Sequence, residues 1–109
     1  MTTMPSVKLL ELGDQEAVIN ARKVIGPVSR KNSVEIIFLL GLRGALRFNE
    51  IKRSLKARDT KGIARALGAL VSSGVVARAV YPFKPPAVEY RLTEKGEAIF
   101  RLMDEMGHF

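Results

Sequence analysis

Apolar residues recur at helical spacing in several segments of the chain, most clearly between Asp59 and Gly74. The apolar positions of this segment fall on one stripe of a helix: Ile63, Ala66, Leu67, Leu70 and Val71. Asp59 is a residue type that caps helix N-termini, and Ser72-Ser73-Gly74 is a sequence that ends helices. The pattern therefore predicts an amphipathic helix over residues 60–73, with Lys61 and Arg65 on its free face.

Two further helices are predicted near the N-terminus. Asp14 is placed to cap a helix over residues 15–25, which Gly26-Pro27 would end. Asn32 precedes a second helix, in which Glu35 would complete a weak capping box and Gly44 would form the C-terminal cap. Apolar residues surround most of this second helix, so we expect it at the centre of the core: Ile36, Ile37, Phe38, Leu39, Leu40 and Leu42.

The remaining segments predict a short helix, a β-hairpin and a terminal helix. Arg47-Phe48 can form a very short strand, and Asn49 can cap a helix to about Leu55, followed by a turn at residues 56–58. Residues 75–81 and 87–92 are rich in β-forming types, and the prolines between them predict an exposed hairpin tip. Thr93 can cap a last helix with one apolar stripe: Ile99, Leu102, Met103 and Met106.

Two consecutive short helices followed by a β-hairpin describe a winged helix-turn-helix, a mainly α fold with a small β-hairpin wing (α+β). We expect a single domain over residues 1–109, with the helix-turn-helix at 48–73 and the wing at 75–92. The terminal helices, about 14–26 and 93–107, carry apolar stripes that a chain of this size does not comfortably bury alone. They predict a homodimer through Val18, Ala21, Val24, Ile25, Ile99, Leu102, Met103 and Met106, the alternative being one closed monomeric core.

Basic residues are concentrated in the middle of the chain. The whole sequence has 18 Lys and Arg against 11 Asp and Glu, but the stretch from Arg43 to Arg65 alone holds eight basic and two acidic residues. Residues 92–109 have a net charge of −2. A basic centre is the electrostatic footprint expected for a polyanion such as DNA, although a merely solvated basic surface has the same composition.

Composition excludes several classes of function. The chain has no cysteine and one histidine, His108, so disulfides and Cys/His zinc sites are excluded, and we expect no metal and no cofactor. No nucleophile–base set or phosphate-binding glycine loop appears, so we do not expect an enzyme. No apolar run approaches the roughly 20 residues of a membrane span, and residues 1–10 lack the features of a secretory signal. A cytoplasmic, nucleoid-associated protein without a membrane partner is expected, and any small-molecule effector is unknown.

In a helix-turn-helix, the second helix enters the major groove of DNA. Arg65 has the geometry to bind both O6 and N7 of a guanine, whereas Gly62 and Gly68 either permit a close approach or only weaken the helix. At the wing, Phe83 either packs back onto the domain or touches a sugar. The expected DNA-binding residues are Asn49, Lys52, Arg53, Lys56, Arg58, Thr60, Lys61, Ala64, Arg65, Gly68, Arg78, Lys84 and Arg91.

Three segments, RFNEIKRSL, SGVV and VYPFKPPAVEYRLTEKG, together resemble the HxlR family of winged-helix transcriptional regulators. The resemblance covers residues 27–106. It implies a homodimeric, cytoplasmic, DNA-binding repressor or activator whose dimer is built mainly from the first and last helices.

The chain departs from the family pattern at three places. The cysteine that family members usually carry before the core helix is absent from residues 26–29, which excludes sensing by cysteine. The family's Gly-Lys-Trp opening of that helix reads Lys31-Asn32-Ser33, and the arginine before the second wing strand is Ala87. Wing contacts are therefore expected to depend on Lys84.

Together these features favour a dimeric DNA-binding transcriptional regulator. Two alternatives remain at this stage: a low-specificity architectural DNA-binding protein, which the sparse polar face of helix 60–73 would suit, and a winged-helix protein-interaction module.

Overall fold

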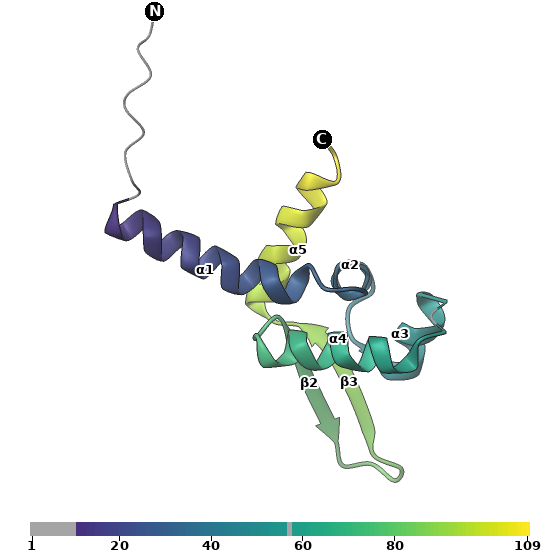
Figure 1. The fold of residues 1–109 in the computed structure, drawn as a ribbon. Helices are drawn as coiled ribbons and strands as arrows, with labels where there is room; N and C mark the ends of the chain where they lie inside the picture. The colour runs from purple at the N-terminus through teal and green to yellow at the C-terminus, as the bar shows by residue number, and fades with distance from the viewer. Residues whose placement is uncertain (1–10, 57) are drawn as a thin grey trace, which may run out of the picture.

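The computed structural model describes residues 11–56 and 58–109. Two predictions fall partly or wholly outside the described residues: the turn at residues 56–58, of which Ala57 is not described, and the absence of a secretory signal from residues 1–10. The elements, in chain order, are α1 (Leu12–Val28), α2 (Ser33–Arg43), β1 (Leu46–Arg47), α3 (Phe48–Ser54), α4 (Thr60–Ser72), β2 (Val76–Tyr81), β3 (Ala87–Leu92) and α5 (Glu94–Met106) (Figure 1). This order confirms the mainly α winged helix-turn-helix fold.

Helix α2 forms the centre of the core, as its apolar circumference predicts. Ile36, Ile37 and Leu40 are at most 1% exposed and share one buried cluster with the stripe of α4. Each such side chain contributes about 1.5–3 kcal/mol when removed from water. Leu42 is the exception to the prediction, since it is 72% exposed near the end of α2.

The three strands form an antiparallel sheet in the order β1-β3-β2. β1 lies one residue earlier than the sequence predicts, because Leu46 pairs with Tyr90 of β3 and Phe48 is left to begin α3. Val76 and Leu92 are paired at the base of the β2–β3 hairpin, and both are buried. Beyond this base the hairpin projects from the body as a wing, on the side away from α1 and α5 (Figure 1).

Two predictions about α1 are wrong. The helix begins at Leu12 after Glu11, so Asp14 lies in its first turn and does not cap it, and the helix runs through Pro27 to Val28. A proline inside a helix costs about 3 kcal/mol because it lacks an N–H and crowds the preceding turn. Val28 is only 7% exposed in the core, so its packing holds this last turn in place.

The sequence misassigns the start of α3, and it correctly assigns the starts of α2, α4 and α5. Asn32 precedes α2 in a left-handed conformation, φ 74°, with no side-chain cap bond, so the capping box with Glu35 is wrong. Asn49 is not the cap of α3, since the helix follows Arg47, whose N–H donates to Glu50 Oε1 at 2.9 Å. The caps of α4 and α5 are confirmed by the hydrogen bonds of Asp59 and Thr93.

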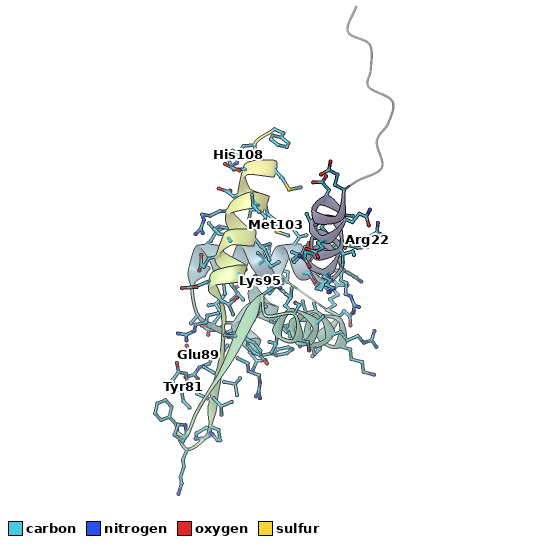
Figure 2. The ribbon with its side chains drawn as sticks, turned by 90° about the vertical axis from the view of Figure 1, so that its left-hand side faces the viewer. Arg22, Tyr81, Glu89, Lys95, Met103 and His108 are labelled. Atoms are coloured by element: carbon cyan, nitrogen blue, oxygen red, sulfur yellow. The ribbon has the colours of Figure 1, made fainter. Side chains whose placement is uncertain are left out.

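The start of α5 is held against the end of α4. The Thr93 hydroxyl lies 3.2 Å from the Val75 carbonyl oxygen, and Lys95 Nζ donates to the Ser73 carbonyl at 2.9 Å. Figure 2 labels Lys95 near the start of α5. A Cβ atom added at Gly96 would collide with the Val75 carbonyl oxygen. Because that neighbour is backbone, only a glycine permits this approach.

This close approach predicts opposite effects of alanine at two helical glycines. Gly96→Ala should lower the free energy of unfolding by about 1–3 kcal/mol because of the clash. Gly68→Ala, where an added Cβ meets no atom within 4 Å, should raise it by up to about 1 kcal/mol through helix propensity. Urea unfolding followed by circular dichroism, at one fixed protein concentration, measures both. An unchanged midpoint for Gly96→Ala would contradict the proposed contact.

Candidate nucleic-acid interface

The outward face of α4 is set by its buried face. Ile63, Leu67 and Leu70 are at most 2% exposed, and Ala66 is buried beside them. The side chains on the other side of the helix are exposed: Thr60, Lys61, Ala64 and Arg65, together with Gly68. Lys61 and Arg65 lie four residues apart, about one helical turn, so both can reach the same stretch of a DNA groove.

On one side of α4 a groove of about 350 Å³ separates the helix from the wing. It is lined by Phe48, Ala64, Leu67, Gly68, Val71, Arg78 and Tyr90. A neighbouring hollow of about 580 Å³ lies between the start of α3 and the end of the hairpin, and includes Asn49, Arg53 and Pro86. The groove and this hollow share Phe48, so the structure brings part of the expected set together: Asn49, Arg53, Ala64, Gly68 and Arg78. Lys52, Thr60, Lys61 and Arg65 line neither of them.

On the other side of α4 lies a smaller hollow of about 180 Å³. Its lining residues are Arg30, Lys31, Asn32, Asp59, Gly62, Arg65 and Ala66. Arg30 and Lys31, in the turn between α1 and α2, are absent from the residues predicted from sequence. The basic pair is visible in the sequence, but no local pattern places it beside α4.

The packing beside this hollow explains why residue 62 is a glycine. A Cβ atom there would collide with the Asp59 carboxylate and lie 3.1 Å from Asn32 Nδ2. The Asp59 carboxylate is in turn fixed by accepting a hydrogen bond from the Gly62 N–H at 2.9 Å. Gly62 therefore permits close packing within the protein, whereas Gly68 is open to an approaching partner.

The two arginines of the wing lie on opposite faces of the hairpin. Arg78 pairs with Tyr90, whereas Arg91 belongs to the next pair along the hairpin, with Ala77. Because side chains alternate between the faces of a strand, Arg78 and Arg91 point in opposite directions. Arg78 lines the groove beside α4, and Arg91 does not.

The wing tip is exposed, as its prolines predict. Lys84 projects there, and the ring of Phe83 stacks on Tyr81 with centroids 5.8 Å apart and 10° between the ring planes. Phe83 remains 61% exposed. It packs on its own hairpin rather than back onto the domain, which places an aromatic pair at the far end of the wing (Figure 2).

The remaining expected contacts surround the turn between α3 and α4. Arg53, Lys56 and Arg58 are exposed, and Lys52 is half-buried. Within residues 11–56 and 58–109, no lysine or arginine side chain forms an ion pair with a carboxylate. The cations of this surface therefore keep their charge available for an external anion.

The predicted dimer residues divide between surface and core. Val18, Ala21, Ile25, Leu102 and Met106 are exposed, Val24 and Met103 are half-buried, and Ile99 is buried. An apolar groove of about 390 Å³ lies between α1 and α5, with Val34 of α2 also in its lining. Met103 lies on the side of α5 that faces α1 (Figure 2).

Two other kinds of feature are absent from the described ranges. No helix there is long and apolar enough to cross a membrane. Over those same residues, no three His, Cys, Asp or Glu side chains are grouped so that they could hold a metal ion.

Comparison with known proteins yields both sequence and structural relatives. An HTH-type transcriptional regulator of Methanothermobacter thermautotrophicus is 34% identical over 96 residues, which span 88% of this chain and 72% of the relative. The HTH-type regulator YvaP of Bacillus subtilis is 34% identical over 84 residues, 77% of each chain.

Solved structures show the same fold. A MarR-family regulator from Porphyromonas gingivalis W83 superimposes with a TM-score of 0.73 at 29% identity and covers 94% of both chains. The reduced form of the B. subtilis transcriptional regulator YodB gives a TM-score of 0.69 at 28% identity, over 92% of this chain and 90% of that one.

The family model that describes the HxlR-like helix-turn-helix matches residues 28–109, the part of the chain that contains α2 to α5. This match agrees with the geometry of α3, α4 and the wing, and with relatives that are regulators and not enzymes. The chain therefore belongs to the HxlR family of helix-turn-helix proteins, and it is a DNA-binding transcriptional regulator.

Proposed function

We propose that the protein binds double-stranded DNA as a homodimer of a single winged-helix domain, with α4 in the major groove and the wing on the flanking backbone. The position of Lys61 and Arg65 carries the proposal. Both lie on the exposed face of α4, opposite the buried stripe. The hollow on one side of the helix holds Arg30 and Lys31, and the groove on the other side holds Arg78. The protein would act in the cytoplasm, on the nucleoid.

Base readout in this arrangement depends mainly on Arg65. Its guanidinium can donate to O6 and N7 of one guanine, while Lys61 suits a phosphate or a second guanine. Ala64 and Gly68 bring α4 close to the DNA but supply no hydrogen-bond donor from their side chains. Sequence preference would then depend partly on the shape and deformability of the DNA.

The apolar groove between α1 and α5 supports dimerisation. Ile25, Leu102 and Met106 are each about three-fifths exposed at its margin, which is unusual for large apolar side chains gathered in one place. A two-fold dimer would cover these side chains with the same residues of the partner. It would also place the two α4 helices about one DNA turn apart.

The proposal is tested by selecting duplexes from a random pool at several salt concentrations. The wild-type protein should enrich a palindromic motif, and Arg65→Ala should relax the preference at one guanine position, at a cost of about 1–3 kcal/mol. Binding without enrichment of any sequence motif would favour a low-specificity architectural function. The absence of polar side-chain groups at Ala64 and Gly68 is compatible with that function. Absence of binding at low salt would contradict both.

The opposite orientation of the two wing arginines predicts different effects on affinity. Arg78→Ala should weaken binding to the selected duplex by about 5-fold or more, as expected for a charge-assisted hydrogen bond to DNA. Arg91→Ala removes the same charge from the other face of the hairpin and should change the dissociation constant by less than about 2-fold. Fluorescence anisotropy measures both, and equal losses would show that the wing does not bind in this orientation.

The dimer is tested by charge at the margin of the α1–α5 groove. Met106→Lys would bury an unpaired ammonium in the proposed interface, so the variant should sediment as a monomer at micromolar concentration where the wild type sediments as a dimer. Leu42→Lys is the control, since Leu42 is also a large exposed apolar residue, 72% exposed against 63% for Met106, but lies outside that groove. A monomeric wild type would contradict the proposed dimer.

A further inference from the structure

The hollow on the side of α4 away from the wing contains, besides Arg65, two basic residues that the contacts proposed above do not use. Arg30 and Lys31, in the turn between α1 and α2, are exposed and meet Arg65 of α4 there. Building on the proposed DNA binding, we propose that this hollow binds a backbone phosphate of the DNA strand opposite the one that the wing contacts.

The position of the hollow determines which strand it would meet. The major groove is about 12 Å wide and is bounded by a phosphate backbone on each side. A helix lying in the groove therefore has one backbone along each flank. The groove lined by Arg78 occupies one flank of α4, and the hollow lined by Arg30 and Lys31 occupies the other.

The charges around the hollow favour an anion. Three cationic side chains, Arg30, Lys31 and Arg65, line it, against the single carboxylate of Asp59. One oxygen of that carboxylate accepts the capping hydrogen bond from the Gly62 N–H. Arginine presents a planar fork that matches phosphate oxygens, and lysine adds a compact positive charge.

The turn that carries the two cations is held in place before any DNA arrives. Val28 and Ser33, on either side of it, are buried, and the Ser33 N–H donates to the Arg30 carbonyl at 3.0 Å. The Asn32 side chain packs against Gly62 in the first turn of α4. A site fixed in this way loses little backbone freedom on binding, which favours affinity.

Such a phosphate contact would set the register of α4 in the groove without reading sequence. Together with the wing it would hold the helix from both sides and thus fix how Lys61 and Arg65 meet the base edges. Its loss should therefore weaken binding to all duplexes by the same factor, unlike the loss of Arg65.

The first test compares Arg30→Ala and Lys31→Ala with Arg101→Ala, which removes one exposed charge from α5. Each of the first two variants should bind the selected duplex and a random duplex more weakly by the same factor. The dependence of log K on log[salt] should also become less steep by about 0.9 for each phosphate that the variant no longer neutralises. Arg101→Ala should leave the affinity and the slope unchanged. Circular dichroism establishes that the variants are folded.

The second test locates the phosphate. Duplexes carrying one uncharged methylphosphonate at each backbone position in turn should reveal the positions at which the wild-type protein loses affinity. One such position in each half-site should lie on the strand that the wing does not contact. At that position the methylphosphonate should not lower the affinity of the double variant Arg30→Ala/Lys31→Ala any further, because this variant no longer binds that phosphate.

The outcomes separate this site from the proposed function. A wild-type protein that binds no duplex overturns both. Normal wild-type binding with unchanged affinity and salt slope for Arg30→Ala and Lys31→Ala overturns the phosphate site alone. An undiminished methylphosphonate effect at every position in the double variant overturns it as well.

Discussion

Burial of one face of α4 is the constraint on which the interface depends. Ile63, Leu67 and Leu70 are nearly inaccessible to solvent and pack with the central helix α2. Turning α4 by one residue, about 100°, would carry this stripe out of the core at a cost of about 1.5–3 kcal/mol for each side chain. The rotation of the helix is thereby set, and Lys61 and Arg65 have no alternative but to face outward.

The ends of α4 link this helix to its neighbours on both sides. At its start, the side chains of Asp59 and Asn32 pack closely against Gly62, and Asn32 belongs to the turn between α1 and α2. This contact connects α4 to that turn. At its end, the bond from Lys95 to Ser73 and the contact of Gly96 with Val75 tie it to α5. If α1 and α5 form the dimer, the contacts at the two ends of α4 fix the position of each α4 relative to the dimer interface. They would therefore set the distance between the two recognition helices.

Local signals in the sequence predict much of the fold. The apolar stripe and Asp59 predict α4, Thr93 predicts the start of α5, and the prolines at 82–86 predict the hairpin tip. The signals at Asp14, Gly26-Pro27 and Asn49 are misleading. Packing of Val28 outweighs the helix-breaking pair, and the pairing of Leu46 with Tyr90 moves the start of α3 to Phe48.

The candidate interface is less predictable than the fold because its parts meet through long-range packing. The opposite directions of Arg78 and Arg91 follow from the hairpin register, which composition does not specify. Arg30 and Lys31 escape prediction because long-range packing brings their turn beside α4, as in the contact between Asn32 and Gly62, 30 residues apart in the chain. Counting charges along the sequence identifies the basic central stretch of the chain, but it does not show which basic residues lie on each side of α4.

The placement of α4 in the major groove is tested most directly by cleavage of DNA from a probe fixed to that helix. The chain has no cysteine, so Ser72→Cys, at the exposed end of α4, offers a single thiol for an iron-chelate cleaver. On the selected duplex, cutting should fall in two clusters whose centres lie about 10 base pairs apart. The same probe at Glu97→Cys on α5 serves as the control and should give no localised cutting. Dispersed cutting from position 72, or a pattern shared by both probes, would contradict the account.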